Sequence, residues 1–340
     1  MMDGLFLLLK TNWKHMPVFH TEDIFGKKFL VTGGAGFIGS HIVEYLLANG
    51  AGSVRVLDNL STGSAKNVAM FHDHGNYEFF DGDIRDMDTC ERACENIDHV
   101  THQAALGSVP RSVKDPVTSN EVNVSGFVNM ITAAKNAGVK TFVYASSSSV
   151  YGDEPNLPKK EERTGNLLSP YAVTKKANEL YAAVFGNLYG MKVVGLRYFN
   201  VFGPRQDPDG PYAAVIPLFV SGILKQTPVY INGDGEQTRD FTYVENAVQA
   251  NIRAMLATNG DAFGQAYNVA VGDKFSVNFL FNAIREMLAI EHSPTYREAR
   301  SGDIRDSLAD ISKARQLLGY EPTQHFLDGL KLTVDYFKGM

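Results

Sequence analysis

The sequence predicts an α/β fold: a doubly wound parallel sheet followed by a smaller C-terminal α/β domain. Short β-branched runs alternate with helical segments over the first 200 residues, a pattern typical of parallel strands covered by helices on both faces. The length of 340 residues suits one large α/β unit or two domains that share a cleft. A hydrophobic fraction of 44% with 21% charged residues is that of a globular chain.

The strands are expected in order at residues 29–32, 53–58, 77–80, 99–102, 141–145 and 192–196. Helical spacing of apolar residues predicts helices at 36–47, 117–137 and 171–189. Gly138 and Gly190 follow the last two helices, where glycine commonly ends a helix. After residue 200 glycines and prolines cluster, and helices are expected at 215–224, 244–256, 277–288 and 326–337. We therefore divide the chain into an extension (1–25), a first domain (26–200) and a second domain (201–340), interleaved with the first.

The net charge and the number of cysteines limit which ligands and which cellular compartment we expect for this protein. The chain has 32 Lys and Arg against 38 Asp and Glu, a net charge of −6. Without a basic excess, we expect no binding of nucleic acid or of an anionic membrane surface, and a phosphate site would be built from a few placed arginines. Cys90 and Cys94 stand one turn apart in a helical segment. They are too few for a disulfide framework or a metal site, so we expect packing thiols, no metal and a reducing compartment.

No apolar run predicts a membrane span or a signal peptide. The longest early run, 5–9, is cut by Lys10, whereas a signal peptide needs a longer apolar core and a small-residue cleavage site. We expect a cytoplasmic protein whose extension packs on the first domain, with Trp13 as a candidate anchor.

A glycine-rich loop follows the first strand and opens the first helix. Gly33, Gly36 and Gly39 stand at spacings that permit a tight turn, a close approach of backbone N–H groups to a pyrophosphate, and close helix packing. Asp58 ends the second strand, where a carboxylate binds both ribose hydroxyls and repels a 2′-phosphate. The pattern predicts a Rossmann fold that binds NAD rather than NADP; a purely structural turn is the alternative. Asp83, after the third strand, is either a ligand of the adenine amino group or an ordinary loop residue.

A serine-rich turn and a Tyr–Lys pair predict acid–base chemistry. Residues 146–149 are all serine and directly follow the fifth strand, and Tyr171 and Lys175 lie one turn apart on one helix face. A free tyrosine has a pKa of about 10, but a nearby ammonium and a positive nicotinamide favour the phenolate. The phenolate could then take a proton from a sugar hydroxyl, while a serine hydroxyl holds the reacting oxygen. A surface Tyr–Lys pair is the alternative.

The motifs resemble those of an extended short-chain dehydrogenase/reductase of the nucleotide-sugar epimerase group. The likeness runs from about 27 to 338 and includes TGGAGFIGS, DGDIRD, SSSSVYG, YAVTK, RYFNVFGPRQ, NGDGEQTRDFTYV and SGDIRDSLADISKA. By resemblance, Ser147, Tyr171 and Lys175 form the catalytic triad. The glycine loop and the resemblance together assign these cofactor-binding residues: Gly33, Gly36, Phe37, Ile38, Gly39, Asp58, Asn59, Ser61, Thr62, Gly63, Asp83, Ile84, Gln103, Ala104, Ala105, Asn123, Tyr171, Lys175 and Tyr198.

The resemblance also implies that the second domain binds a nucleotide sugar. Asn200 resembles the family's diphosphate-contacting asparagine, and Arg239 and Arg300 resemble its two clamping arginines, which can bind a diphosphate bidentately. A surface salt bridge is the alternative for each arginine alone. The implied substrate-binding set is Gly107, Ser108, Ser147, Ser148, Ser149, Asn200, Gln206, Val215, Leu218, Tyr230, Asn232, Arg239, Arg300, Asp303 and Ser307.

The resemblance also discriminates among reactions. Family dehydratases carry Thr-Asp-Glu where this chain has serines 147–149, so reversible oxidation at C4 of the sugar, a 4-epimerisation, is implied. Ser307 and Gly107 are small where glucose and galactose enzymes carry bulkier residues, which resembles bacterial UDP-N-acetylglucosamine 4-epimerases of surface-polysaccharide pathways. Open alternatives are a UDP-glucose/UDP-galactose 4-epimerase, a UDP-N-acetyl-uronic acid 4-epimerase, a net oxidoreductase and a non-catalytic NAD-binding protein. The helices at 117–137 and 171–189 resemble the pair that forms a four-helix homodimer contact in the family.

Overall fold

The computed structural model describes residues 17–208, 214–299 and 305–340. Its centre is a parallel sheet of seven strands, which confirms the predicted fold class. The strand order is β11 (Gln265–Val269), β6 (Val193–Tyr198), β5 (Thr141–Ser147), β4 (His99–His102), β1 (Lys28–Thr32), β2 (Ser53–Asp58) and β3 (Tyr77–Asp81). Six strands lie where the sequence predicted them. The seventh, β11, was not predicted.

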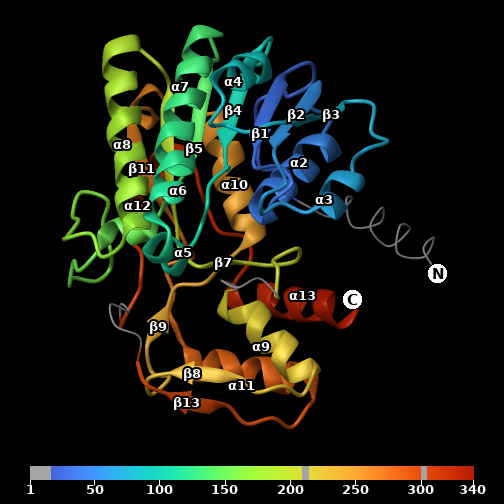
Figure 1. Cartoon of the computed structure of the whole chain (residues 1–340), viewed down its shortest axis with the longest axis vertical. Coiled ribbons are helices and arrows are strands. Elements are labelled where there is room, and N and C mark those ends of the chain that lie inside the picture. Colours follow the sequence, from blue (N-terminus) through green and yellow to red (C-terminus); the bar gives the residue numbers. More distant parts are fainter. Residues whose placement is uncertain (1–16, 209–213, 300–304) are drawn as a thin grey trace.

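Helices cover both faces of the sheet (Figure 1). One face carries α4 (Met87–Cys94), α7 (Gly126–Asn136) and α8 (Pro170–Tyr189), and the other carries α2 (Phe37–Ala48), α10 (Val244–Met255) and α12 (Ser312–Leu318). The predicted helix at 117–137 is interrupted: α6 (Pro116–Asn120) passes through a π-helical turn, η1 (Glu121–Ser125), into α7. Shorter helices are α3 (Ala65–Ala69), α5 (Val109–Lys114), η2 (Ser148–Tyr151) and η3 (Gly260–Ala262).

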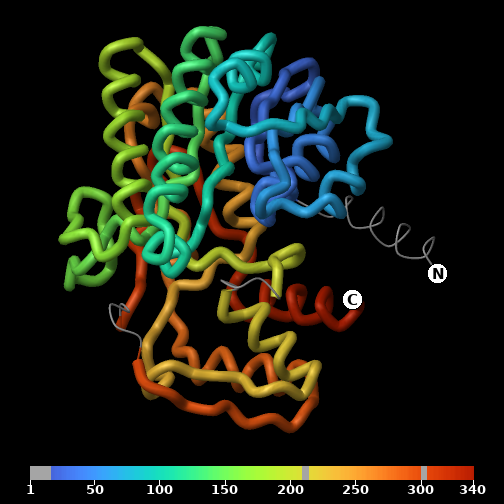
Figure 2. The backbone as a smooth tube through the Cα atoms, in the orientation of Figure 1, coloured from blue at the N-terminus to red at the C-terminus, as the bar shows by residue number. Residues whose placement is uncertain are grey.

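A smaller lobe lies beyond the carboxyl ends of the strands (Figure 1). It contains α9 (Val215–Leu224), β8 (Tyr230–Asn232), α11 (Val277–Leu288), β13 (Thr295–Arg297) and α13 (Phe326–Lys338), around an apolar core that includes Phe219, Phe281 and Phe326. Two short two-stranded sheets lie in the segments that connect the large sheet to the lobe. In one, β7 (Val201–Phe202) pairs with β10 (Thr242–Tyr243), and in the other, β9 (Thr238–Arg239) pairs with β12 (Phe275–Ser276). The chain crosses between sheet and lobe repeatedly (Figure 2), so α10 and β11 belong to the sheet although they follow residue 200.

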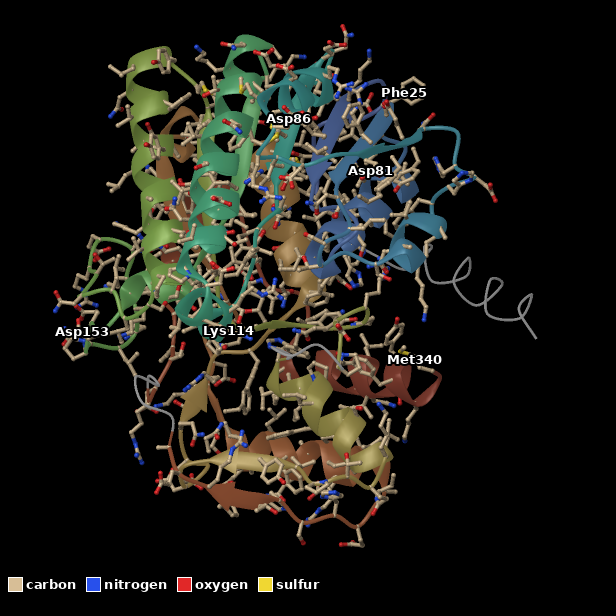
Figure 3. The ribbon with its side chains drawn as sticks, in the orientation of Figure 1. Phe25, Asp81, Asp86, Lys114, Asp153 and Met340 are labelled. Carbon is tan, nitrogen blue, oxygen red and sulfur yellow. The ribbon has the colours of Figure 1, made fainter. Side chains whose placement is uncertain are left out.

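The end of the extension packs on α2. Phe19 is buried and stacks on the Tyr45 ring with 5.3 Å between centroids, and its backbone N–H donates to Tyr45 Oη at 2.7 Å. Ile24 is also buried, and the exposed Phe25 precedes β1 at the end of the sheet away from the lobe that holds Met340 (Figure 3). Trp13 lies outside the described residues. Phe19 and Ile24 therefore contribute to the core of the sheet domain.

Cys90 and Cys94 lie on α4 as free, fully buried thiols. Burial raises the pKa of each to about 12, so both are unreactive packing groups. Among the residues that the structure describes, no His, Cys, Asp and Glu side chains gather into a metal site, and no helix there has the length and apolarity to cross a bilayer.

Candidate active site

A cleft of about 460 Å³ opens at the carboxyl ends of the strands, where β1 and β4 lie side by side and the strand order reverses. This is where open α/β sheets bind ligands. The structure brings together in this cleft every predicted cofactor residue except Asn123. Its lining also includes residues that the sequence analysis did not select: Leu57, Gly82, Arg85, Leu106, Thr118, Val122, Ala145 and Ser146.

The glycine loop is shaped by contacts that leave no room for side chains. Gly33 has φ +69°, and a Cβ there would lie 2.7 Å from the backbone nitrogen of Ala104. A Cβ on Gly39 would overlap the carbonyl oxygen of Gly33. The loop therefore needs glycine both for its turn and for its close approach to the 103–104 backbone, and it leaves the start of α2 open to an anionic group.

Asp58 is held with its carboxylate at the wall of the cleft. Its Oδ2 accepts from the Ala35 N–H at 3.0 Å and its Oδ1 from the Leu60 N–H at 2.8 Å. Burial raises the pKa of Asp58, and these two hydrogen bonds act in the opposite direction. A fixed carboxylate beside a glycine loop fits the ribose and pyrophosphate of NAD.

Asp83 is engaged within the chain. It accepts hydrogen bonds from Asn59 Nδ2 at 2.9 Å and from an Arg85 guanidinium nitrogen at 2.7 Å, and these Arg85 contacts hold its pKa below the usual value. It also accepts from the Arg85 backbone N–H at 2.8 Å, which makes a local turn. Asp83 thus lies in the cleft and stabilises its own loop.

The Tyr–Lys pair lies at the other end of the lining. Lys175 Nζ donates to the Ala145 carbonyl at 2.8 Å and lies 5.9 Å from the centre of the Tyr171 ring. Burial lowers the pKa of Lys175 to about 8. Burial also raises the pKa of Tyr171, while the Ser147 hydroxyl lowers it. The sequence predicts a lowered pKa for Tyr171 beside both Lys175 and a bound nicotinamide, whereas in the chain alone burial raises the pKa of Tyr171.

Asn123 lies next to the cleft and not in its lining. It lies on η1, is buried, and is absent from the cleft lining. Its side chain accepts from the Leu106 N–H at 2.7 Å and donates to the Leu106 carbonyl at 3.2 Å. The π-helical turn, which is often found at functional sites, thus turns Asn123 toward the 103–107 segment and holds that segment at the cleft edge.

A second cavity of about 290 Å³ lies between the sheet connections and the lobe. It contains the predicted substrate residues Asn200, Val215, Tyr230, Asn232 and Arg239, together with apolar side chains of β7 and α9. Arg239 Nη1 donates to the carbonyls of Thr238 at 2.8 Å and Arg305 at 3.1 Å. This cavity combines amide and guanidinium groups with apolar side chains, a composition suited to a nucleotide.

The remaining predicted substrate residues divide into three groups. Gly107 lines the larger cleft rather than the second cavity. Arg300 and Asp303 lie outside the described residues. The third group lines neither cavity and comprises Ser108, Ser147, Ser148, Ser149, Gln206, Leu218 and Ser307. Within the described chain, Ser149 Oγ and Gln206 Oε1 are buried without a hydrogen-bond partner.

Ser307 lies in an extended segment, residues 305–310, held on both sides. On one side the Ser307 N–H donates to the Thr238 carbonyl at 3.1 Å. On the other, the Lys159 N–H donates to the Leu308 carbonyl at 2.7 Å. Ser307 is therefore buried beside Thr238, the residue that precedes Arg239. It lies between the lobe and the loop that follows the serine turn.

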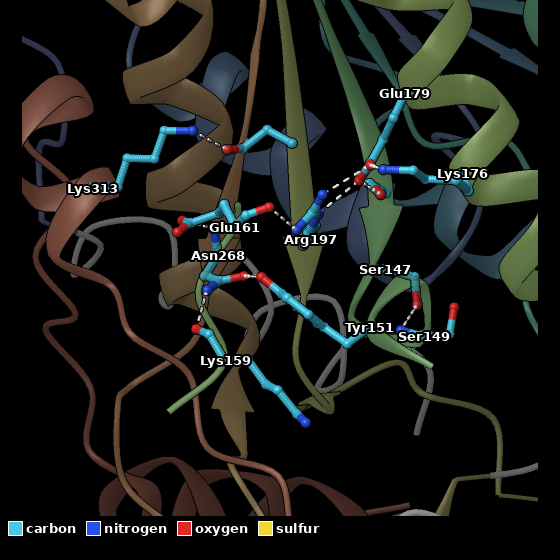
Figure 4. Close-up of polar contacts among 12 residues, drawn as sticks. Ser147, Ser149, Tyr151, Lys159, Glu161, Lys176, Glu179, Arg197, Asn268 and Lys313 are labelled. Carbon is cyan, nitrogen blue, oxygen red and sulfur yellow. Dashed lines mark hydrogen bonds and ion pairs between the residues drawn. The ribbon is translucent and has the colours of Figure 1, made fainter. Parts of the chain in front are cut away.

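A buried polar network lies behind the Ser–Tyr–Lys elements (Figure 4). Arg197 of β6 makes a bidentate ion pair with Glu179 of α8, at 2.8 and 2.9 Å, and Ser146 donates to Glu179 at 2.7 Å. Tyr151, whose ring lies under Arg197, donates to Asn268 of β11 at 2.6 Å. The network therefore fixes to one another the elements α8, β5 and β6, which carry Tyr171, Lys175, Ser147 and Tyr198.

This geometry defines a class: an α/β protein with a cleft suited to a dinucleotide, Tyr171 and Lys175 at one end of its lining with Ser147 next to them, and a second cavity suited to a nucleotide. The model of the NAD dependent epimerase/dehydratase family matches residues 29–270. The chain belongs to this family, it is an enzyme, and its cofactor is NAD.

Relatives and solved structures agree with the assignment. The chain is 40% identical over 311 residues to the UDP-glucose 4-epimerase of Mycolicibacterium smegmatis, with 91% of this chain and 98% of the relative covered. It is 42% identical to the UDP-N-acetylglucosamine 4-epimerase of Methanobrevibacter ruminantium in complex with UDP-N-acetylmuramic acid, at a TM-score of 0.87, covering 92% and 98% of the two chains. It is 39% identical to the UDP-glucose 4-epimerase of Thermus thermophilus complexed with NAD, at a TM-score of 0.81, covering 92% and 99%.

Proposed function

We propose that this chain is a UDP-N-acetylglucosamine 4-epimerase that interconverts UDP-N-acetylglucosamine and UDP-N-acetylgalactosamine for surface-polysaccharide precursors. The observation that carries the proposal is the serine turn beside the Tyr–Lys pair. Residues 147–149 offer hydroxyls and no carboxylate, and Ser149 Oγ is buried without a partner in the described chain. Elimination of water needs an acid and a base beyond Tyr171, and this turn supplies neither.

NAD, when bound, supplies the hydride acceptor and donor for C4. Tyr171 takes the proton of the 4-hydroxyl as base and gives it back as acid. Because burial raises its pKa in the chain alone, the positive charges of Lys175 and of the nicotinamide are required to favour the phenolate. Ser147 holds the reacting oxygen in line with Tyr171, and Lys175, fixed by the Ala145 carbonyl, keeps its charge beside the ring.

The second cavity is the proposed site of the UDP group. Arg239 and Arg300 clamp the diphosphate in charge-assisted hydrogen bonds, Asn200 contacts it, and Tyr230 and Asn232 hold the uracil and ribose. The sugar then points toward Ser147 and Tyr171. Ser307 forms the small wall beside the C2 substituent, which favours an N-acetylated sugar.

The proposal is tested by an epimerisation assay over UDP-glucose, UDP-galactose and their N-acetylamino forms. We expect turnover of the N-acetylated pair to exceed that of the other pair. A higher turnover of UDP-glucose and UDP-galactose, or of UDP-N-acetyl-uronic acids, would make the corresponding alternative the function. Net accumulation of reduced nicotinamide would favour a net oxidoreductase. The absence of any turnover would favour a non-catalytic NAD-binding protein.

Substitution at Ser307 tests the wall directly. Ser307→Tyr adds a ring where the N-acetyl group lies, and overpacking a filled site costs about 1–3 kcal/mol. The variant should lose about tenfold or more of its activity on the N-acetylated sugars, since about 1.4 kcal/mol corresponds to a factor of ten, and much less on the others. Ser307→Ala keeps the space and should keep the preference. An equal loss on all four sugars would mean general damage and would remove the assignment.

We further propose a homodimer formed through α8 and its neighbours. Exposed apolar residues follow one face of α8, beside others on α5 and α6: Val173, Leu180, Val184, Leu188, Val113 and Val117. A second copy of the chain would cover this face in a four-helix contact. The two free thiols suit a reducing compartment, and we place the enzyme in the cytoplasm.

A further inference from the structure

Asn251 on α10 is fully buried and reaches the wall of the cofactor cleft from behind. Its Nδ2 donates to Tyr198 Oη and to the Ala247 carbonyl, both at 2.7 Å. Its Oδ1 accepts from Gln103 Nε2 at 3.0 Å and from Thr101 Oγ1 at 2.9 Å. The side chain thus makes the four hydrogen bonds an asparagine can make.

Three of these side chains close a ring. Tyr198 Oη, which accepts from Asn251, donates to Gln103 Oε1 at 3.0 Å. Gln103 Nε2 donates back to Asn251 Oδ1 and also to Thr101 Oγ1 at 2.8 Å. Gln103 and Tyr198 line the cleft that Tyr171 and Lys175 also line, whereas Asn251 and Thr101 do not. The ring therefore joins two cleft residues to a hub outside the cleft.

The direction of every bond in the ring is set by one backbone group. The Ala247 carbonyl can only accept, so the NH₂ group of Asn251 must face it and Tyr198. Its oxygen must then face Gln103, which turns the Gln103 NH₂ toward Asn251 and the Gln103 oxygen toward Tyr198. The Tyr198 proton is committed to that oxygen, and burial raises the pKa of Tyr198 above its ordinary value. Tyr198 is thereby excluded as a second proton donor or acceptor for the sugar.

We propose that Asn251 is a positioning residue of the cofactor cleft, which fixes the orientations of Gln103 and Tyr198 beside the Tyr171–Lys175 end. The backbone of Gln103 and Ala104 lies against Gly33, so a rotated Gln103 side chain would disturb the part of the cleft lining that would hold NAD beside Tyr171 and Lys175. This role depends on the NAD cofactor and not on which sugar the enzyme takes.

The test compares two asparagines of the same helix. Asn246 is also fully buried on α10, but its side chain binds the backbone of residues 323 and 324, away from the cleft. Asn251→Leu and Asn246→Leu therefore remove the same group at the same burial. We expect Asn251→Leu to raise the dissociation constant of the cofactor-stripped protein for NAD, measured by calorimetry, by tenfold or more. Asn246→Leu should change it less than twofold even when its melting temperature falls equally.

Turnover supplies the second measurement. Asn251→Leu should lower kcat by tenfold or more while KM for the UDP-sugar stays within threefold, because the second cavity does not touch the ring. Failure of the proposed sugar specificity would leave the NAD measurement intact. Equal NAD affinities of Asn251→Leu and the wild type, or equal losses in the two asparagine variants, would overturn the proposal.

Two isosteric Thr→Val variants test the proposal in the case that Asn251→Leu does not fold. Thr101→Val removes one acceptor of Gln103 and should weaken NAD binding about threefold. Thr141 is a buried threonine at the first residue of β5, and its hydroxyl donates to the Met255 carbonyl and makes no contact with the ring. Thr141→Val should not weaken NAD binding. Identical NAD affinities in these two variants would also contradict the role of the ring.

Discussion

Tyr171 shows two opposing effects on a single catalytic group. Burial disfavours its phenolate, and the Ser147 hydroxyl favours it. Lys175 is buried, and burial lowers its pKa to about 8. The spacing of Tyr171 and Lys175 predicts that the two lie on one helix face, but it could not reveal how far each is removed from water, since burial depends on segments that are distant in sequence.

Tyr171→Phe removes the proton acceptor but keeps the ring. We expect the variant to fold, to retain NAD, and to lose about two or more orders of magnitude in kcat, the contribution typical of general acid–base catalysis. Stopped assays with product separation measure this loss. A variant with near wild-type turnover would show that another group accepts the proton.

Asp58→Ala removes the carboxylate that Ala35 and Leu60 hold at the cleft wall. NAD affinity should fall by about tenfold or more, because hydrogen bonds to a charged group contribute about 1.5–3 kcal/mol, while the melting temperature changes little. Cofactor content after purification and calorimetric titration measure this. Full NAD occupancy in the variant would contradict the assigned ribose site.

At the scale of the element, regular strands were predictable and irregular ones were not. The six β-branched runs gave strands within one or two residues of the observed bounds. β11 (Gln265–Val269) was missed because it follows the lobe and contains Gln, Asn and Ala, so only the preceding helix α10 hinted at a return to the sheet. The π-helical turn in the 117–137 helix changes the backbone pitch without changing the apolar pattern, and so leaves no signal.

The buried ion pair between Arg197 on β6 and Glu179 on α8 allows a test of what holds these two elements together. Breaking a buried ion pair by removing one partner costs about 3–5 kcal/mol, so Glu179→Gln should lower the free energy of unfolding by about that amount in urea titrations. Lys176, half-buried and 3.3 Å from Glu179, provides the control: Lys176→Met should cost about 0–1 kcal/mol. Equal small losses would show that the ion pair does not hold α8 to β6.

The same pair predicts acid sensitivity. Burial alone would raise the pKa of Glu179, but the hydrogen bonds and charge of Arg197 hold it below its ordinary 4.5. Its contribution to stability is therefore complete above pH 4.5 and is lost as pH falls through the lowered value. Glu179→Gln should show a smaller loss of stability below pH 4.5 than the wild type.

At the scale of the whole molecule, the site is assembled from segments that only the fold brings together. Residues near 200, 239 and 307 meet through β7, β9 and the 305–310 segment, and no local pattern encodes those contacts. The charged and the proposed catalytic residues of the site could be predicted from the resemblance to the family. It did not find Asn251 or Asn268, because a buried asparagine in a helix or strand looks in sequence like a solvated one.

The apolar face of α8 makes a prediction for the assembly. The double substitution Leu180→Lys and Val184→Lys places two charges where a second copy would bury them, so a dimer should become a monomer in analytical ultracentrifugation. Leu327→Lys, at an exposed leucine of α13 in the lobe, should leave the dimer intact. A monomeric wild type, or a double variant that stays dimeric, would exclude this interface.

The central claim is that the sugar is oxidised at C4 and reduced again at the same carbon, with Tyr171 as acid and base. The measurement follows deuterium placed at C4 of UDP-N-acetylglucosamine until the two epimers reach equilibrium in ordinary water. We expect UDP-N-acetylgalactosamine that retains deuterium at C4, with no net change in the absorbance of reduced nicotinamide. Product that carries solvent hydrogen at C4, or reduced nicotinamide that accumulates in step with sugar consumed, would contradict it.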